Sequence, residues 1–136
     1  MKISPYLSFD GQCQAALEFY ARCLGGTIVY STTYGESPMA SQVPPGWVSR
    51  IYHATLTAGG RSLGAADAPP GAYSSPQGFF VMLEIDEPAE AERIFGMLSE
   101  GGIVQMPIQA THWARRFGVL TDPFGIPWMI NCGEPA

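Results

Sequence analysis

The chain has 136 residues, of which 46% are hydrophobic and 14% charged, and its formal net charge is −5. This length and apolar content fit one globular domain and exclude an intrinsically disordered acidic chain, which combines low hydrophobicity with high charge. The seven Lys and Arg residues are too few for a basic nucleic-acid surface. No apolar run approaches the roughly 20 residues of a membrane helix, so we expect neither nucleic acid nor a membrane as partner.

The N-terminus and the cysteines indicate a cytoplasmic protein. Residues 1–5 (MKISP) lack the apolar core of a signal peptide. The three cysteines, Cys13, Cys23 and Cys132, are odd in number and widely spaced, whereas a disulfide framework or a zinc site needs paired, closely spaced ligands. We therefore expect reduced thiols, with Cys13 and Cys132 packed as small hydrophobic side chains.

The first half of the chain is predicted to hold four strands and one helix. In chain order the predicted elements are a strand over 3–9, a helix ending at Leu24, and strands over 27–33, 48–57 and 61–65. Asp10 is the expected N-cap of the helix, and Gly25-Gly26 ends it. Gly59-Gly60 forms a turn between the last two strands. Loops rich in Pro and Gly are expected over 35–47 and 67–78.

The second half repeats this order of elements. The predicted elements are a strand over 79–85, a helix from Glu87-Pro88 to Gly101-Gly102, and strands over 103–108, 117–121 and 126–132. Pro88 suits the first position of a helix because it has no N–H to leave unpaired there. Residues 122–125 (DPFG) form the turn before the last strand.

The two halves are related by a constant spacing of 76 residues. This spacing relates Gly25-Gly26 to Gly101-Gly102 and also Phe9 to Ile85. It predicts an α+β fold of two β-α-β-β-β modules, 1–66 and 77–134, in one domain over 1–136, although two unrelated α+β stretches could also match by chance. Each sheet would have one face covered by its helix, and the free faces would curl around an apolar cleft for a small molecule.

Five segments follow one another along the chain: 5–9 (PYLSF), 16–20 (ALEFY) running on to Gly26, 53–56 (HATL), Trp113 with Phe117-Gly118, and 121–131 (TDPFGIPWMIN). In this order they resemble the PhnB-like branch of the glyoxalase/bleomycin-resistance group, the vicinal-oxygen-chelate superfamily. The resemblance implies paired β-α-β-β-β modules and a homodimer. Whether the modules pair within one chain or exchange between two stays open.

The resemblance also implies a divalent metal in the enzymes of the superfamily, held by His or Glu of the first and last strand of each module. The positions that match here are Ser4, His53, Phe80 and Met129. Of these only the histidine binds a divalent cation well. We therefore expect no metal and no other cofactor, with residual metal binding at His53 as the alternative.

His53 is the most informative single residue. Because strand residues alternate between faces, His53 lies on the opposite face from Ala54 and Leu56, which suit the face under the helix. His53 is thus expected to point toward the cleft. Three roles are open: a hydrogen-bonded structural residue, a ligand contact, or a catalytic acid or base whose ordinary pKa is already near neutrality.

The first strand of each module supplies further candidates. By the same alternation, Tyr6 and Ser8 face the cleft together with Ser4, opposite Phe80, Met82 and Glu84. Glu84 would be a carboxylate among apolar side chains, which must find a partner or titrate at a raised pKa. Its alternative is a buried salt bridge to one of three arginines, Arg50, Arg115 or Arg116.

Three candidates come from the ends of strands and from irregular segments. Asp67 follows the strand over 61–65 and could contact a ligand or serve as an ordinary turn-capping aspartate. Trp113 could line the cavity or belong to the core. His112 stands where relatives commonly carry an aromatic residue, and it is either a second imidazole near the cleft mouth or a solvent-exposed side chain.

The sequence favours a protein that binds a small organic ligand in an apolar cleft without the usual metal of its superfamily. The expected ligand-binding residues are Tyr6, Ser8, His53, Asp67, Glu84 and Trp113. The alternative is a lyase, isomerase or transferase-type enzyme that uses His53 in acid–base chemistry or as a metal ligand. A third hypothesis is an accessory module whose interface matters more than its cleft.

Overall fold

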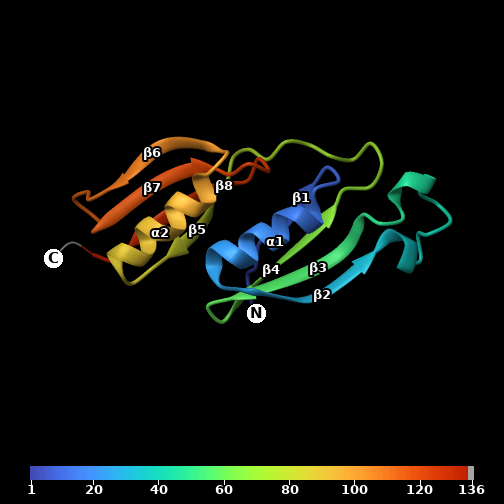
Figure 1. The fold of residues 1–136 in the computed structure, drawn as a ribbon, viewed down its shortest axis with the longest axis horizontal. Coiled ribbons are helices and arrows are strands. Elements are labelled where there is room, and N and C mark those ends of the chain that lie inside the picture. Colours follow the sequence, from blue (N-terminus) through green and yellow to red (C-terminus); the bar gives the residue numbers. More distant parts are fainter. Residues whose placement is uncertain (135–136) are drawn as a thin grey trace. The chain divides into compact units, whose positions relative to one another are not determined.

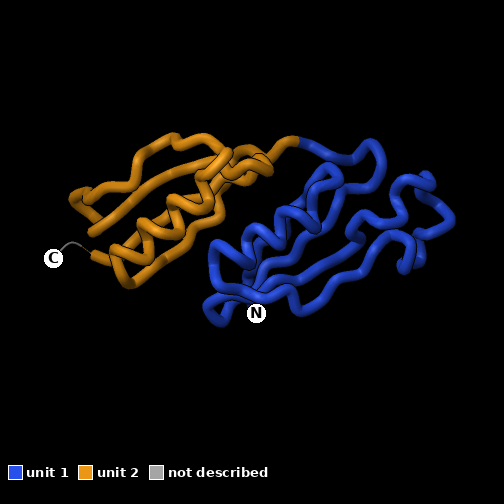
Figure 2. Tube along the Cα trace, viewed as in Figure 1, with its two compact units in different colours: residues 1–74 blue, residues 75–136 orange. Residues whose placement is uncertain are grey.

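The computed structural model describes residues 1–134, which form two compact units with their boundary between Ser74 and Ser75 (Figure 2). Each unit contains one α-helix and one four-stranded sheet (Figure 1). Neither helix has the length or the apolar character needed to cross a membrane, within the residues described.

Unit one has the connectivity β-α-β-β-β. Its elements are β1 (Tyr6–Phe9), α1 (Cys13–Leu24), β2 (Thr27–Thr33), β3 (Ile51–Ala58) and β4 (Arg61–Asp67). The sheet order is β1-β4-β3-β2, in which β1 is parallel to β4 and the other pairs are antiparallel. Two short 3-10 turns, Tyr34–Glu36 and Pro45–Trp47, lie in the long connection between β2 and β3.

Unit two repeats this arrangement strand for strand. Its elements are β5 (Val81–Glu84), α2 (Pro88–Ser99), β6 (Ile103–Gln109), β7 (Arg116–Thr121) and β8 (Pro127–Cys132). The sheet order is β5-β8-β7-β6, with β5 parallel to β8 and the other pairs antiparallel. The predicted α+β class and the two β-α-β-β-β modules are therefore confirmed.

In each unit the helix covers one face of the sheet, and the core lies between them (Figure 1). Strand residues that alternate toward the helix are almost fully buried, such as Ala54 and Leu56 in unit one and Trp128 and Ile130 in unit two. The prediction that Ala54 and Leu56 face the helix is confirmed. The opposite face of each sheet has no helix, and we call it the open face of that unit.

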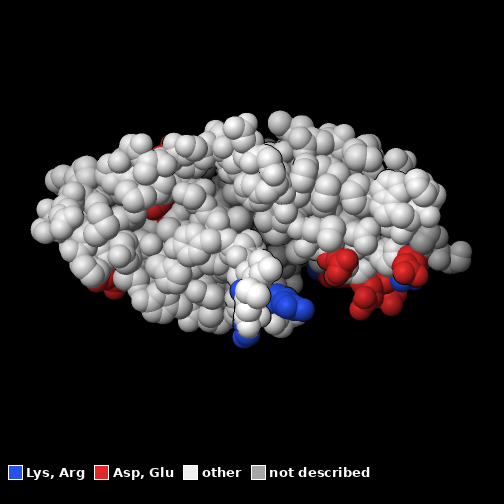
Figure 3. All heavy atoms as spheres, turned by 180° about the vertical axis from the view of Figure 1, so that it is seen from behind, with Lys and Arg blue, Asp and Glu red and all other residues white. Residues whose placement is uncertain are grey.

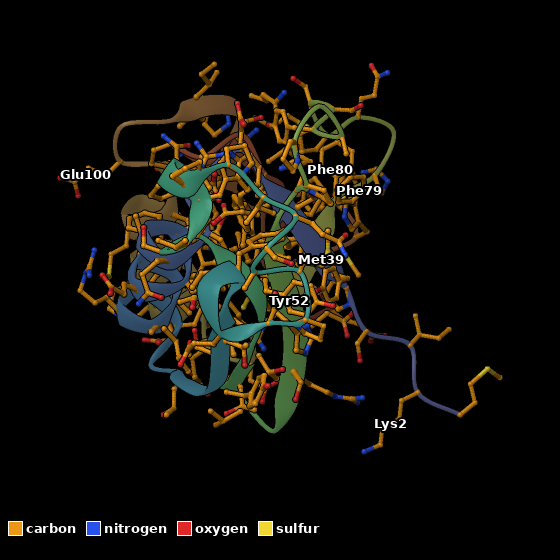
Figure 4. All side chains as sticks on the ribbon, turned by 90° about the vertical axis from the view of Figure 1, so that its right-hand side faces the viewer. Lys2, Met39, Tyr52, Phe79, Phe80 and Glu100 are labelled. Atoms are coloured by element: carbon orange, nitrogen blue, oxygen red, sulfur yellow. The ribbon has the colours of Figure 1, made fainter. Side chains whose placement is uncertain are left out.

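Several predicted boundaries change in the structure. Strand β1 begins at Tyr6, and residues 1–5 before it are exposed, with Lys2 projecting away from the body of unit one (Figure 4). The predicted N-cap, Asp10, is wrong: Gln12 occupies that position and makes no side-chain cap. Strand β3 starts at Ile51 rather than Val48 because Arg50 N–H donates to Trp47 O and closes the preceding turn.

The constant spacing of 76 residues holds only as far as the second strand of each unit. Seventeen residues, 34–50, separate β2 from β3, whereas six residues, 110–115, separate β6 from β7. Leu7 pairs with Ala65 and Leu83 with Ile130, so β4 and β8 are related by a shorter spacing, 65. Because the connection between β2 and β3 is longer than the one between β6 and β7, the spacing between equivalent residues changes after it.

The missing cap of α1 is supplied from another part of the chain. Asp67, at the end of β4 and 1% exposed, accepts the N–H of Cys13 through Oδ1 at 3.0 Å and the N–H of Ile51 through Oδ2 at 2.8 Å. Its own carbonyl accepts the Tyr34 hydroxyl at 2.7 Å. One buried carboxylate thus satisfies the first amide of α1 and the first amide of β3.

Unit two also contains a buried aspartate that accepts several hydrogen bonds, Asp122, in the turn between β7 and β8. Its Oδ1 accepts the N–H groups of Phe124 and Ile126, and its Oδ2 accepts the indole N–H of Trp128 at 2.8 Å. The side chain is 3% exposed. The predicted turn over 122–125 is confirmed, and its aspartate also fixes the largest side chain of the core.

The three cysteines are free and buried, as expected of reduced thiols that pack in the core. Burial raises the pKa of the Cys13 thiol to about 12, and the negative charge of Asp67 adds to this effect. At neutral pH Cys13 is therefore a thiol and not a nucleophilic thiolate.

Asp67→Asn should lower the free energy of unfolding by about 2–3 kcal/mol, because an amide nitrogen would replace one of two charged acceptors of backbone N–H groups. Urea unfolding followed by circular dichroism measures this change. Asp10→Asn is the matched control, since Asp10 is exposed and is not the N-cap. Equal stabilities of the two variants would contradict the role assigned to Asp67.

Candidate functional site

The open face of unit one brings together two of the predicted site residues, Tyr6 and His53. Tyr6 on β1 pairs in register with Gly64 on β4, and Gly64 pairs with Thr55 on β3. His53 lies two residues before Thr55 and therefore on the same face. The expectation that Tyr6 and His53 share a face opposite the helix is correct.

Tyr6 reaches across a whole strand to meet His53. The Tyr6 hydroxyl lies 2.8 Å from His53 Nδ1, although β4 runs between β1 and β3. The ring can pass over β4 because the residue beneath it is Gly64, where a Cβ atom would lie 2.5 Å from Tyr6 Cδ2. A glycine inside a strand marks a close approach of this kind, and the sequence carried that signal.

Two further residues of this face were not among the predicted ones. Tyr30 on β2 has its ring centroid 5.7 Å from that of His53, and its hydroxyl accepts the Thr32 hydroxyl at 2.5 Å. Thr32 pairs in register with His53. We call Tyr6, His53, Tyr30 and Thr32 the Tyr–His cluster. The β-branched and aromatic pattern of 27–33 predicted the strand, but not the direction in which Tyr30 points.

The protonation of the Tyr–His cluster follows from the hydrogen bond. Partial burial, together with nearby groups that become negative on ionisation, raises the pKa of the Tyr6 phenol, which therefore keeps its proton at neutral pH. We assign the Tyr6 O–H as the donor to Nδ1 of the neutral imidazole, which places the His53 proton on Nε2. The cluster thus offers an N–H donor and a phenol oxygen with free lone pairs.

Ser8 and Asp67, also predicted to contact a ligand, have different positions. Ser8 is exposed and follows Tyr6 on the same face, in register with Ala66. Asp67 alternates onto the helix side with Phe9, its partner in register, and both of its carboxylate oxygens accept backbone N–H groups. The capping alternative for Asp67 is therefore the one that the structure supports.

The open face of unit two carries the remaining candidates, Glu84 and Trp113. Glu84 on β5, Asn131 on β8 and Phe117 on β7 form one row across the sheet. The Trp113 ring contacts the Phe117 ring edge to face at a centroid distance of 5.3 Å, and it remains 46% exposed. The His112 ring packs against Trp113 in a similar way and is exposed.

Glu84 has no ion-pair partner among the residues described, and the predicted salt bridge is wrong. Arg116 forms an ion pair with Glu92, and Arg115 donates to the carbonyl oxygen of Asp86. Arg50 lies over the Trp47 ring, 4.0 Å from its centroid. Each arginine has a structural role, and Glu84 is exposed to solvent instead.

An open hollow of about 260 Å³ lies in unit two. It is lined by residues of the segment before β5, including Phe79 and Phe80, and by Gln105, Thr121 and Pro127. Both phenylalanines are 44% exposed (Figure 4).

The positions that the resemblance assigns to a metal need one correction. His53 lies on β3, the third strand of its unit, and not on the last strand. Since Tyr6 pairs with Gly64 as Met82 pairs with Met129, the counterpart of Met129 in unit one is Gly64. The four positions are then Ser4, Gly64, Phe80 and Met129, whose side chains do not fit a divalent cation. Residues 1–134 hold no group of three or more His, Cys, Asp or Glu side chains that could bind a metal.

Charge is sparse on the molecular surface drawn in Figure 3. Acidic and basic atoms occupy small separate areas there, and Lys and Arg form no continuous patch on this face. This distribution agrees with the low charged content of the sequence.

Tyr6→Phe should change the tautomer of His53, because the phenol no longer donates a hydrogen bond that holds the proton on Nε2. Imidazole nitrogen shifts in a long-range ¹H–¹⁵N spectrum measure the two tautomers directly. We expect the Nε2–H form to dominate in the wild-type protein near pH 8 and a mixture in the variant. An unchanged spectrum would contradict the donor role of Tyr6.

The chain is similar to known proteins over almost its whole length. Protein YjdN of Escherichia coli (strain K12) is 38% identical over 139 aligned residues, which cover 96% of this chain and 95% of that protein. The crystal structure of protein PA1353 from Pseudomonas aeruginosa is 43% identical and covers 99% of both chains, with a TM-score of 0.87. The PhnB protein from Bacillus cereus is 24% identical, covers 98% of this chain and 100% of that one with a TM-score of 0.82, and so shares the fold.

A family model gives the same result. The model of the Glyoxalase/Bleomycin resistance protein/Dioxygenase superfamily matches residues 2–130. Together with the two β-α-β-β-β units, this match shows that the chain belongs to the glyoxalase/bleomycin-resistance/dioxygenase superfamily.

Proposed function

We propose that this protein binds a small organic ligand on the open face of unit one, without the divalent metal of its superfamily. The observation that carries this proposal is the hydrogen bond between Tyr6 and His53 on a face that no helix covers. Such a contact between two polar rings could be made in the core, where it would only stabilise the fold. Here Tyr6 is 56% exposed and accessible to a ligand.

The composition of this face supports binding of a small molecule. Tyr6 and Tyr30 leave more than half of their surface exposed, whereas the strand between Tyr6 and His53 contributes only the small residues Gly64 and Ala66. Large side chains thus stand around small ones, and a few polar groups converge between them. Ligand sites commonly combine apolar surface with a small number of well-placed polar groups.

The finer assignment to the PhnB-like branch belongs to the same proposal. It is supported by the five resembling segments and by the shared fold of the Bacillus cereus PhnB protein. A homodimer, a cytoplasmic location and a cleft shared by the two modules stay predictions from the sequence and from this resemblance.

The alternative function is an enzyme that uses His53 as an acid or base. The specific observation in its favour is that the 2.8 Å contact between the Tyr6 hydroxyl and Nδ1 orients the ring and leaves Nε2 outside this hydrogen bond. As a base at Nε2 the imidazole carries its own proton on Nδ1 and donates it to the phenol oxygen, and as an acid it is the imidazolium, which gives up the Nε2 proton. The two functions differ in outcome: an enzyme turns its ligand over, whereas a binding protein returns it unchanged.

We expect His53→Ala and Tyr6→Leu to weaken ligand binding by about tenfold each, since each removes a ring and one hydrogen-bond partner. A thermal-shift screen of metabolites and antibiotics identifies ligands, and isothermal titration then gives Kd for the wild type and both variants. Glu100→Gln is the control, because Glu100 is exposed at the end of α2 (Figure 4). Ligands whose binding is unaffected by both variants would contradict the proposed site.

Product analysis of the same samples separates binding from catalysis. Chromatography after prolonged incubation should recover the ligand unchanged. Turnover that His53→Ala abolishes while binding is retained would establish the enzyme instead.

Metal analysis tests the other half of the proposal. Protein purified without chelators should contain far less than one equivalent of Zn, Ni, Mn or Fe, because Ser4, Gly64, Phe80 and Met129 offer no strong ligand for a divalent cation. Inductively coupled plasma mass spectrometry measures this content. A stoichiometric metal that is lost in His53→Ala would overturn the metal-independent reading.

A further inference from the structure

We infer that the Tyr–His cluster selects a flat, uncharged aromatic or heteroaromatic molecule, which stacks on the paired rings of Tyr6 and His53. This inference rests on the proposed function and names the class of its ligand. It is carried by the mutual orientation of the two rings, by the glycine beneath Tyr6, and by the uncharged residues in register with them on the open face.

The rings of Tyr6 and His53 are nearly parallel to each other. Their planes differ by 12° and their centroids lie 5.6 Å apart, so their faces point in the same direction. The hydrogen bond at 2.8 Å between the hydroxyl and Nδ1 holds them in this relation. A ligand of two or three fused rings is long enough to cover both faces, and stacking of planar rings on aromatic side chains is favourable.

Tyr30 borders this surface at an angle. Its ring is tilted by 48° from the His53 plane at a centroid distance of 5.7 Å, and the bond from Thr32 to its hydroxyl restrains it. A tilted ring beside a flat surface suits the edge of a planar ligand, since edge-to-face contact is a favourable aromatic geometry. A puckered, saturated ring would lose the contact with the face of Tyr6 and His53 or the contact with Tyr30.

The chemistry of the surrounding positions favours an uncharged ligand. The open-face residues of unit one in register around the cluster are Ser8, Thr55, Ser62, Gly64 and Ala66, and none is charged. A charged group on the ligand would lose water without gaining an opposite charge. The His53 Nε2–H is the available donor, so we assign the ligand an acceptor such as a carbonyl or ring nitrogen at its rim.

Gly64 gives a selective way to disturb the surface. In Gly64→Ala the new Cβ would lie 2.5 Å from Tyr6 Cδ2 and 2.8 Å from Cε2, so the tyrosine ring must move from its position beside His53. Gly96→Ala is the matched control, because a Cβ at Gly96 on α2 meets no atom within 4 Å. Both variants add one methyl group, and only the first touches the cluster.

The test uses two probes with the same amide and the same carbon skeleton, naphthalene-2-carboxamide and its fully saturated analogue. We expect the aromatic probe to bind the full chain about tenfold more tightly than the saturated one, and its ring protons to shift upfield on binding. Gly64→Ala should weaken binding of the aromatic probe at least fivefold, and Gly96→Ala should leave it unchanged. Kd values come from ligand-observed and amide NMR titrations, which also verify that each variant is folded.

A second pair of variants keeps the test independent of the folding of Gly64→Ala. Tyr6→Phe retains a ring and should keep most of the preference for the aromatic probe, whereas Tyr6→Leu should abolish it. Equal affinity for the two probes, with both still dependent on His53, would overturn this inference and leave the proposed function standing. If the Kd of both probes is the same for the wild type and for the variants of Tyr6 and His53, the proposed function is overturned as well.

Discussion

Asp67 connects three parts of unit one through a single buried carboxylate. It satisfies the first amide of α1 at Cys13 and the first amide of β3 at Ile51, while its carbonyl holds the hydroxyl of Tyr34. These bonds fix where β3 begins and therefore which of its residues face the helix. His53 lies two residues after Ile51, and its position on the open face follows from that start. The carboxylate is structural, yet the candidate site depends on it.

The open face of unit one owes its character to a contrast in side-chain size. Gly64 lets the Tyr6 ring cross β4 and meet His53, and any larger residue there would separate them. The hydrogen bond then orients the imidazole, and Tyr30 and Thr32 on β2 complete the cluster. Rigid rings around small residues suit the recognition of shape, because little side-chain entropy is lost on binding.

Unit two has the same topology and a different surface. Where unit one places Gly64 and the Tyr–His cluster, unit two places Met129 and a row formed by Glu84, Asn131 and Phe117. Its buried aspartate, Asp122, lies in the turn before β8 and anchors Trp128 instead of a helix terminus. The two units therefore share a fold but are stabilised by different side-chain hydrogen bonds, and the residues of each open face vary independently of the fold.

The sequence by itself determined the α+β class, the two modules and the order of strands and helices along the chain, because alternation, glycine pairs and turn residues are local signals. It also determined that Tyr6 and His53 share a face, since alternation along a strand needs no knowledge of its neighbours. Only the tertiary structure decided that the connection over 34–50 shifts the repeat, that His53 lies on the third strand, and that Asp67 replaces Asp10 at the start of α1. It alone brought Tyr30, Thr32 and Gly64 to the same place. These outcomes depend on pairings between segments far apart in the chain, which local patterns do not encode.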